Sequence, residues 1–251
     1  MTNLPAGRTA KTPKCGGRVP RSVLAFTLLL AGALVPVAGS EPRGWETARL
    51  VPAPTEPLKG YRGIRRVHVV SERFRQEAWL DAWTELSEAG FAYQILSERG
   101  SEQIRNRVLR PMLQREQELV ADGSDRAALT DANYVFTELE EAGGELAVLI
   151  KPRRKDVVLV DGRVVLTPDG SDVARIEGRL AKTPSFWTSR VDVRRHFVTI
   201  DGVRVTVSTE TLARVRLAGE SRMQVAYEYE SINGHPVSAA GRQLLARAAV
   251  R

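Results

Sequence analysis

Apolar and polar residues alternate along the second half of the chain, and this alternation predicts β-strands. Residues 203–207 read Val-Arg-Val-Thr-Val, and residues 225–229 read Val-Ala-Tyr-Glu-Tyr. Because side chains two residues apart on a strand share a face, such strands carry one apolar and one polar face. Similar runs predict strands at 76–86, 90–97, around Tyr134 and Phe136, and at 146–150, 157–160, 163–166, 173–180, 191–200, 203–217 and 223–230.

Four dipeptides typical of turns lie between or after these runs: Asp161-Gly162, Asp169-Gly170, Asp201-Gly202 and Asn233-Gly234. Each places a residue that tolerates positive φ before a glycine, as two-residue hairpin turns require. The clearest hairpin is predicted at Asp161-Gly162, between 157–160 and 163–166. Connections this short force neighbouring strands to run antiparallel, so we expect a meander.

Residues 101–122 are predicted to form one long helix. Ser101 can act as the N-cap, Asp122-Gly123 ends the segment, and apolar residues recur near a 3.6-residue period at Ile104, Val108 and Met112. Pro111 lies inside this segment, lacks a backbone N–H and should kink or divide the helix near Arg110.

The predicted strand at 76–86 contains two tryptophans. Trp79 and Trp83 are four residues apart, so both indoles and the intervening Asp81 are expected on one face of the strand. We assign this face to the interior, although an aspartate fits poorly on an apolar face.

Residues 1–40 have the three-part layout of a secretory signal peptide. Basic residues precede an apolar run at 23–38, and the small residues Ala38-Gly39-Ser40 follow it. An uncleaved anchor is the alternative, but the run is shorter than a membrane-spanning helix prefers and contains Pro36. We therefore expect export, and localisation to the periplasm or cell envelope after cleavage.

The remaining chain divides into three parts. Residues 41–60 hold four prolines and few large apolar residues, which predicts an extended tether. Residues 61–237 carry the strands and the helix, and residues 238–251 are a short helix or a frayed tail. The expected fold class is α+β, mainly β: a strongly curved antiparallel half-barrel sheet packed on one long helix.

The positive charge does not indicate a nucleic-acid binder. The formal net charge is +7, but residues 1–40 contain five basic residues and no acidic one, which leaves 32 basic against 30 acidic residues in the remainder. A basic nucleic-acid binder carries its excess charge on the folded domain. The single cysteine, Cys15, also lies in this leader, so the mature chain has no disulfide or thiol chemistry.

No catalytic or metal site is evident, and we expect no enzymatic activity and no cofactor. The three histidines, His68, His196 and His235, show no metal-ligand spacing, and His196 is expected on the charged face of a strand. A hydrolase would need a nucleophile beside one of them. Glu138, Glu140 and Glu141 precede Gly143-Gly144 and are assigned to a solvated loop rather than to acid–base catalysis.

Two segments are candidates for ligand or partner binding. The basic run at 151–155 includes Arg153 and Arg154, which either solubilise a strand end or contact anionic headgroups or an acidic partner. Phe186 and Trp187 follow Pro184 in a loop and either plug the core of the sheet or form an aromatic wall of a lipophilic pocket.

These segments carry a family resemblance. Residues 149–155, 175–179, 184–187 and 200–203 resemble the outer-membrane lipoprotein-sorting (LolA-like) superfamily, over roughly residues 62–233. The resemblance implies an export signal, a helix lying against a strongly curved antiparallel sheet, and an open half-barrel. Members include carriers of lipoprotein acyl chains, sensors of envelope stress and uncharacterised exported proteins.

The leading prediction is a protein that binds a lipophilic ligand, an acyl chain or a lipoprotein, between the concave face of the sheet and the helix. The residues assigned to apolar contacts are Trp79, Trp83, Phe186, Trp187, Tyr227 and Tyr229, and those assigned to headgroup or partner contacts are Arg153 and Arg154. Peripheral membrane contact is compatible with this prediction. The alternative is an envelope interaction or stress-sensing protein whose sheet is filled by its own side chains.

Overall fold

The computed structural model describes residues 50–121, 125–142, 144–186, 188–216 and 219–248. The signal segment at 1–40, residues 41–49 of the tether, Asp122-Gly123 and Trp187 lie outside these ranges. Among the described residues, no helix is long and apolar enough to span a membrane.

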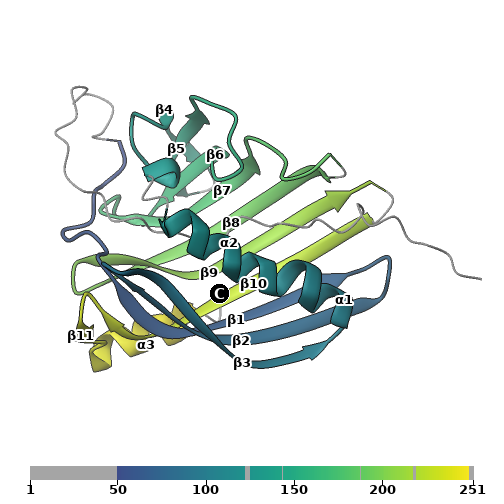
Figure 1. The fold of residues 1–251 in the computed structure, drawn as a ribbon. Coiled ribbons are helices and arrows are strands. Elements are labelled where there is room, and N and C mark those ends of the chain that lie inside the picture. Colours follow the sequence, from purple (N-terminus) through teal and green to yellow (C-terminus); the bar gives the residue numbers. More distant parts are fainter. Residues whose placement is uncertain (1–49, 122–124, 143, 187, 217–218, 249–251) are drawn as a thin grey trace, which may run out of the picture.

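An eleven-stranded antiparallel sheet dominates the molecule (Figure 1). Its strands are β1 (Tyr61–Ser71), β2 (Gln76–Ser87), β3 (Gly90–Gly100), β4 (Tyr134–Ala142), β5 (Glu145–Pro152), β6 (Val160–Leu166), β7 (Val173–Leu180), β8 (Thr188–Ile200), β9 (Val203–Val215), β10 (Gly219–Ile232) and β11 (His235–Pro236). The predicted fold class, α+β and mainly β with a curved antiparallel sheet, is confirmed.

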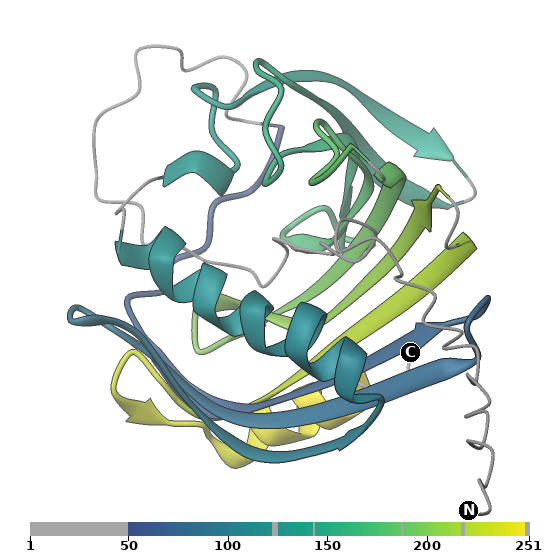
Figure 2. The ribbon, with the colours of Figure 1, turned by 45° about the vertical axis from the view of Figure 1, so that its right-hand side comes forward.

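The meander is interrupted once. The order β3-β2-β1-β10-β9-β8-β7-β6-β5-β4 places the first strand beside the last long one. The chain makes three strands, crosses the concave side as a helix and returns through seven further strands, until β10 pairs with β1 along its full length. Figure 2 shows the sheet curving around the crossing helix. The helix therefore joins the two outer edges of one open sheet.

The crossing helix is continuous but irregular. It comprises α1 (Glu102–Ile104), a π-helical segment at Arg105–Leu109 and α2 (Arg110–Ala121). The Ser101 hydroxyl accepts a hydrogen bond from the backbone N–H of Ile104 at 3.5 Å, so the predicted N-cap is confirmed. The wider π turn lies directly before Pro111, where the Arg110 N–H reaches the carbonyl of Arg105. The predicted irregularity near Arg110 is thus a π turn, which accommodates the missing proline N–H without dividing the helix.

One predicted hairpin is wrong. Asp161-Gly162 lies inside β6, where Gly162 pairs with Gly178 of β7. A Cβ added to Gly162 would lie 2.6 Å from the Gly178 Cα, so glycine is present for close strand approach rather than for a turn. Asp201 and Asn233 have φ of 50° and 49° and begin tight turns as predicted. Asp169-Gly170 belongs to a longer connection at 167–172.

The end of the predicted tether is part of the folded domain. Leu58 is buried, and the backbone N–H of Glu56 donates to the Gly202 carbonyl at 3.0 Å. The Asn233 side chain accepts hydrogen bonds from the backbone N–H groups of Lys59 and Gly60 and donates to the Pro57 carbonyl. One turn residue therefore fastens residues 57–60 to the sheet, which sequence alone did not indicate.

The C-terminal tail folds as a helix, α3 (Ala239–Ala248). It packs against β8, and a Cβ added to Gly241 would lie 2.9 Å from a methyl of Ile200. The helical alternative for residues 238–251 is therefore correct for most of that segment.

We predict that Asn233→Ala destabilises the protein by about 2 kcal/mol, because it loses both a residue tolerant of positive φ and the bonds to residues 57–60. Asp201→Ala is the matched control, since Asp201 has the same φ before a glycine, and it should cost only about 1 kcal/mol. Urea denaturation measures both costs. Hydrogen exchange at residues 59 and 60 should rise in Asn233→Ala alone, and equal exchange in both variants would contradict the fastening role.

Candidate functional site

The concave face under the crossing helix is built around a buried ion pair. Arg65 of β1 is 0% exposed and Glu116 of α2 is 2% exposed. Two guanidinium–carboxylate hydrogen bonds join them, and the one from Nη2 to Oε1 is 3.0 Å long. The same Nη2 donates to the Tyr61 hydroxyl at 2.9 Å, and the guanidinium carbon lies 4.9 Å from the centre of the Tyr227 ring. Sheet and helix are thereby joined by a bidentate, fully desolvated contact.

The electrostatics keep this cluster in one protonation state. Burial acts to lower the pKa of Arg65, but the charge and hydrogen bond of Glu116 together with the nearby Tyr61 and Tyr227 outweigh it and raise the pKa well above its usual value. Burial raises the pKa of Tyr61 and of Tyr229, so both phenols remain neutral hydrogen-bond donors. In this cluster Arg65 therefore stays cationic and both phenols stay neutral.

Beside this centre, the concave face carries a row of hydroxyls without hydrogen-bond partners among the described residues: Thr206, Thr209, Thr211 and Tyr227. All four side chains are buried. Thr209 pairs with Val225 and Thr211 with Met223, so apolar side chains flank them on the same face. A buried hydroxyl without a partner costs about 1–3 kcal/mol, which makes this row unusual in a folded protein. We call these four residues the hydroxyl row.

Other hydroxyls on this face are satisfied. The Thr84 hydroxyl of β2 donates to the Gly63 carbonyl at 3.3 Å, and the Tyr229 hydroxyl donates to the Thr206 carbonyl at 2.6 Å. Among the described hydroxyls, those without partners therefore lie on one stretch of β9 and β10.

The structure corrects the placement of two predicted site residues. Trp79 and Trp83 lie on the convex face, because β2 buries the alternate positions Ala78, Leu80, Ala82, Thr84 and Leu86. Trp79 stacks on His68 at 4.6 Å and has the Arg99 guanidinium 4.6 Å from its ring, while Arg62 covers Trp83. Asp81 shares this solvent side, which resolves its poor fit to an apolar face. Neither tryptophan lines the concave face.

The other predicted aromatic residues that the structure describes lie in two places. Tyr227 and Tyr229 lie on the concave face, in contact with the Arg65 cluster. Phe186 is 77% exposed, beneath the Arg216 guanidinium, and so does not plug the core.

Arg153 and Arg154 hold the segment before β4. Arg153 donates to the carbonyls of Asp131 and Tyr134, and Arg154 donates to the Asn133 side chain and the Arg126 carbonyl. These bonds give both arginines a structural role that the basic run alone did not reveal.

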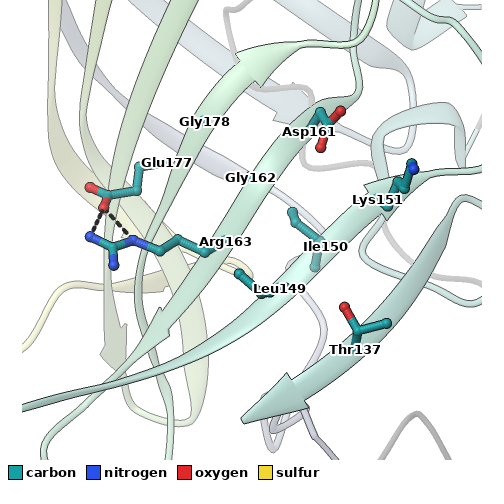
Figure 3. Close-up of a pocket in the computed structure, with 9 residues that line it drawn as sticks. All are labelled: Thr137, Leu149, Ile150, Lys151, Asp161, Gly162, Arg163, Glu177 and Gly178. Carbon is teal, nitrogen blue, oxygen red and sulfur yellow. Dashed lines mark hydrogen bonds and ion pairs between the residues drawn. The ribbon is translucent and has the colours of Figure 1, made fainter. Parts of the chain in front are cut away.

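Two hollows lie on the convex face of the described residues, and the second is lined by His68, His196, Asp81, Ser208 and Glu210. The first, of about 510 Å³, lies over the Gly162–Gly178 pair between Lys151 and Glu177 (Figure 3). Glu177 there accepts hydrogen bonds from Arg163, Arg175 and Arg194 at 2.7, 3.0 and 3.1 Å. Burial alone would raise its pKa, but these bonds and charges lower the pKa to about 2. This carboxylate is a structural anion.

The second hollow, of about 450 Å³, is lined by residues that include Trp79, Asp81 and both His68 and His196. Desolvation lowers the pKa of His196, and the nearby Arg175 and Arg194 charges act in the same direction. His196 pairs with Ser208 on the outer side of β8, which agrees with its expected place on a charged strand face. Among the described residues, no three His, Cys, Asp or Glu side chains gather as metal ligands would.

Comparisons with known proteins identify no relative by sequence: no family model and no curated protein matches. Among solved structures, a DUF1329 family protein from Desulfovibrio piger is similar over 69% of this chain and 85% of its own, at 9% identity and a TM-score of 0.31. A likeness this distant carries no conclusion about function.

We predict that Arg65→Met and Glu116→Leu each destabilise the protein by about 3–5 kcal/mol, because each leaves one buried charge without a partner. The double variant should recover most of that loss, since it removes both charges. Urea denaturation of the four proteins measures the coupling. Additive losses would show that the two side chains do not depend on each other.

We predict that Glu177→Gln removes about 1–3 kcal/mol of stability at neutral pH. The folded-state pKa is depressed, so this contribution is complete above the ordinary glutamate value of 4.5 and is lost as the pH falls towards 2. Stability measured from pH 7 to pH 3 should therefore be flatter in the variant. Glu145→Gln, which removes one partner of Arg175 alone, should have the smaller effect, and identical acid profiles for wild type and Glu177→Gln would contradict the assignment.

Proposed function

We propose that the protein is a non-enzymatic binder of an amphipathic, lipophilic ligand on the concave face of its sheet. The observation that carries this proposal is the hydroxyl row: four buried hydroxyls on the concave face without partners in the described part of the chain. A bound polar group would satisfy them, and the adjacent apolar side chains would contact a hydrocarbon chain.

The hydrogen-bonding chemistry of the hydroxyl row indicates which polar groups the ligand would carry. Its members are neutral and each both donates and accepts hydrogen bonds, which suits ester carbonyls and hydroxyl groups. Arg65 is already paired with Glu116, so it is not available to an anionic group. Arg195 of β8, opposite Thr209, is a further cation of this face. We therefore propose a ligand that carries an acyl ester, as in a lipid or a lipidated protein.

Two features of the sequence support an envelope setting. Residues 1–40 have the layout of an export signal, and the motifs at 149–155 and 175–187 resemble the lipoprotein-sorting superfamily. We propose an exported carrier or receptor of that kind, located in the periplasm or cell envelope.

A second candidate is an interaction or stress-sensing protein without a small ligand. The observation that favours it is the filled region under the helix, where Arg65, Glu116, Leu109 and Leu113 are almost completely buried. In that case the hydroxyl row would be satisfied by ordered water.

We predict that the double variant Thr209→Val/Thr211→Val is more stable than wild type by about 1 kcal/mol or more, because it removes two unpartnered hydroxyls without changing shape. The same variant should retain a fluorescent fatty-acid ester about tenfold less well, since the ligand's polar group loses its partners. Thermal unfolding and fluorescence titration measure the two effects.

Thr84→Val is the matched control, because its hydroxyl has a backbone partner and its loss should destabilise the protein. Native mass spectrometry of protein purified from an envelope-containing host should show a bound lipid in wild type. Ligand-free wild-type protein that also ignores the fluorescent ester would refute the proposal and favour the second candidate.

A further inference from the structure

One end of the sheet gathers basic connections. The antiparallel register brings the β1–β2 turn at 72–75, the end of β9, the β7–β8 loop at 181–186 and the β5–β6 connection at 153–159 to the same edge. In Figure 1 the β1–β2 turn and the end of β9 lie at the right. We call this edge the basic end, and its described cationic residues are Arg73, Arg75, Arg126, Arg153, Arg154, Lys155, Lys182 and Arg216. The same connections contain two acidic residues, Glu72 and Asp156, and Asp156 pairs with Arg126 and Arg154.

The opposite end has the reverse character. Its described turn residues at 88–89, 167–172, 201–202 and 233–234 contain acidic residues and no lysine or arginine. Basic residues therefore outnumber acidic ones in the turns of one end and acidic ones prevail in the turns of the other, although Lys59 lies near the acidic turns and the two charges nearly balance after residue 40. Such separation orients a protein in front of a charged surface.

Two exposed phenylalanines lie at the basic end. Phe74 is 44% exposed at the tip of the β1–β2 turn, between Arg73 and Arg75. Phe186 is 77% exposed and has the Arg216 guanidinium 5.1 Å from its ring. A Cβ added to Gly219 would lie 3.3 Å from the Arg73 Cβ, so the turn bearing Phe74 adjoins the β9–β10 connection, at whose start lies Arg216.

We propose that the basic end docks the protein on an anionic phospholipid surface, with the rings of Phe74 and Phe186 at headgroup level. Guanidinium groups bind phosphate in bidentate fashion, and aromatic rings prefer the membrane–water interface. Polyanions such as nucleic acid would use the charges but leave both phenylalanines in water. The combination of charge and exposed apolar rings therefore favours a lipid surface over a polyanion.

The test is co-sedimentation of the full chain with vesicles of phosphatidylcholine, with or without a quarter of phosphatidylglycerol. Any apolar segment of the chain binds both vesicle types, so the ratio between them isolates the charged contribution. We expect several-fold preference for the anionic vesicles at about 0.05 M salt and its loss at about 0.5 M salt.

Variants at the basic end, compared with control variants elsewhere, test whether this end contacts the vesicle. Phe74→Ser/Phe186→Ser and Arg73→Glu/Lys182→Glu should each weaken binding to the anionic vesicles at least about fivefold. The controls Leu96→Ser, an exposed apolar residue of β3, and Lys59→Glu, on the segment fastened at the opposite end, should leave it unchanged. Arg153 and Arg154 are not altered, because they hold the segment before β4.

Three outcomes would overturn the proposal. These are an equal affinity for neutral and anionic vesicles, equal losses in the control variants, and binding to single-stranded DNA that is as tight as to vesicles and unaffected by the phenylalanine substitutions. The proposal does not depend on the concave-face ligand, since Thr209→Val/Thr211→Val should bind vesicles as wild type does.

Discussion

The buried contact between Arg65 and Glu116 determines how the helix and the sheet fit together. A strongly curved sheet cannot pack on itself, so its concave face needs a cover, and one helix supplies it here. Apolar packing alone allows a helix to slide or rotate, whereas a bidentate ion pair with both charges desolvated defines a single register. The ring of Tyr227 and the hydroxyl of Tyr61 complete the enclosure of the guanidinium.

This arrangement leaves the concave face with two different regions. Under the helix, polar atoms of the central cluster are largely paired and the packing is tight. Along β9, beside that cluster, the hydroxyls of Thr209 and Thr211 are buried without partners among the described residues, between Val225 and Met223 of β10 and Arg195 and Val193 of β8. Stability would favour valine at both positions, and the proposed ligand would supply the partners that the two threonine hydroxyls lack. The proposed ligand site follows from this local departure from good packing.

Alternation, turn dipeptides and helical period predicted most of the fold. They identified the strands from 173 to 230, the helix at 101–122 and its irregularity near Pro111, because each signal is local. The false hairpin at Asp161-Gly162 shows the limit: glycine permits both a turn and a close strand approach, and only the partner Gly178 distinguishes them. The docking of residues 57–60 on Asn233 depends on a contact across more than half of the chain.

The candidate site was harder to predict than the fold. The strand period correctly puts Trp79, Asp81 and Trp83 on one face, but the assignment of that face to the interior is wrong, and Asp81 was the signal for the solvent side. Arg65 and Glu116 were missed, although Arg65 shares its strand face with Val67 and Val69, and Glu116 lies one helical turn after Met112. A charged residue in register with an apolar face was the available signal. Its partner was not predictable, since that pairing is made by the tertiary structure.

The most direct test of the central claim is photo-crosslinking with a diazirine-bearing fatty-acid ester, followed by mass-spectrometric mapping of the labelled residues. If the concave face binds the ligand, labels concentrate on β9 and β10 around Thr209, Thr211 and Tyr227, and excess unlabelled ester abolishes them. Labels confined to the convex face around Trp79 and Trp83, or no specific label at all, would contradict the account.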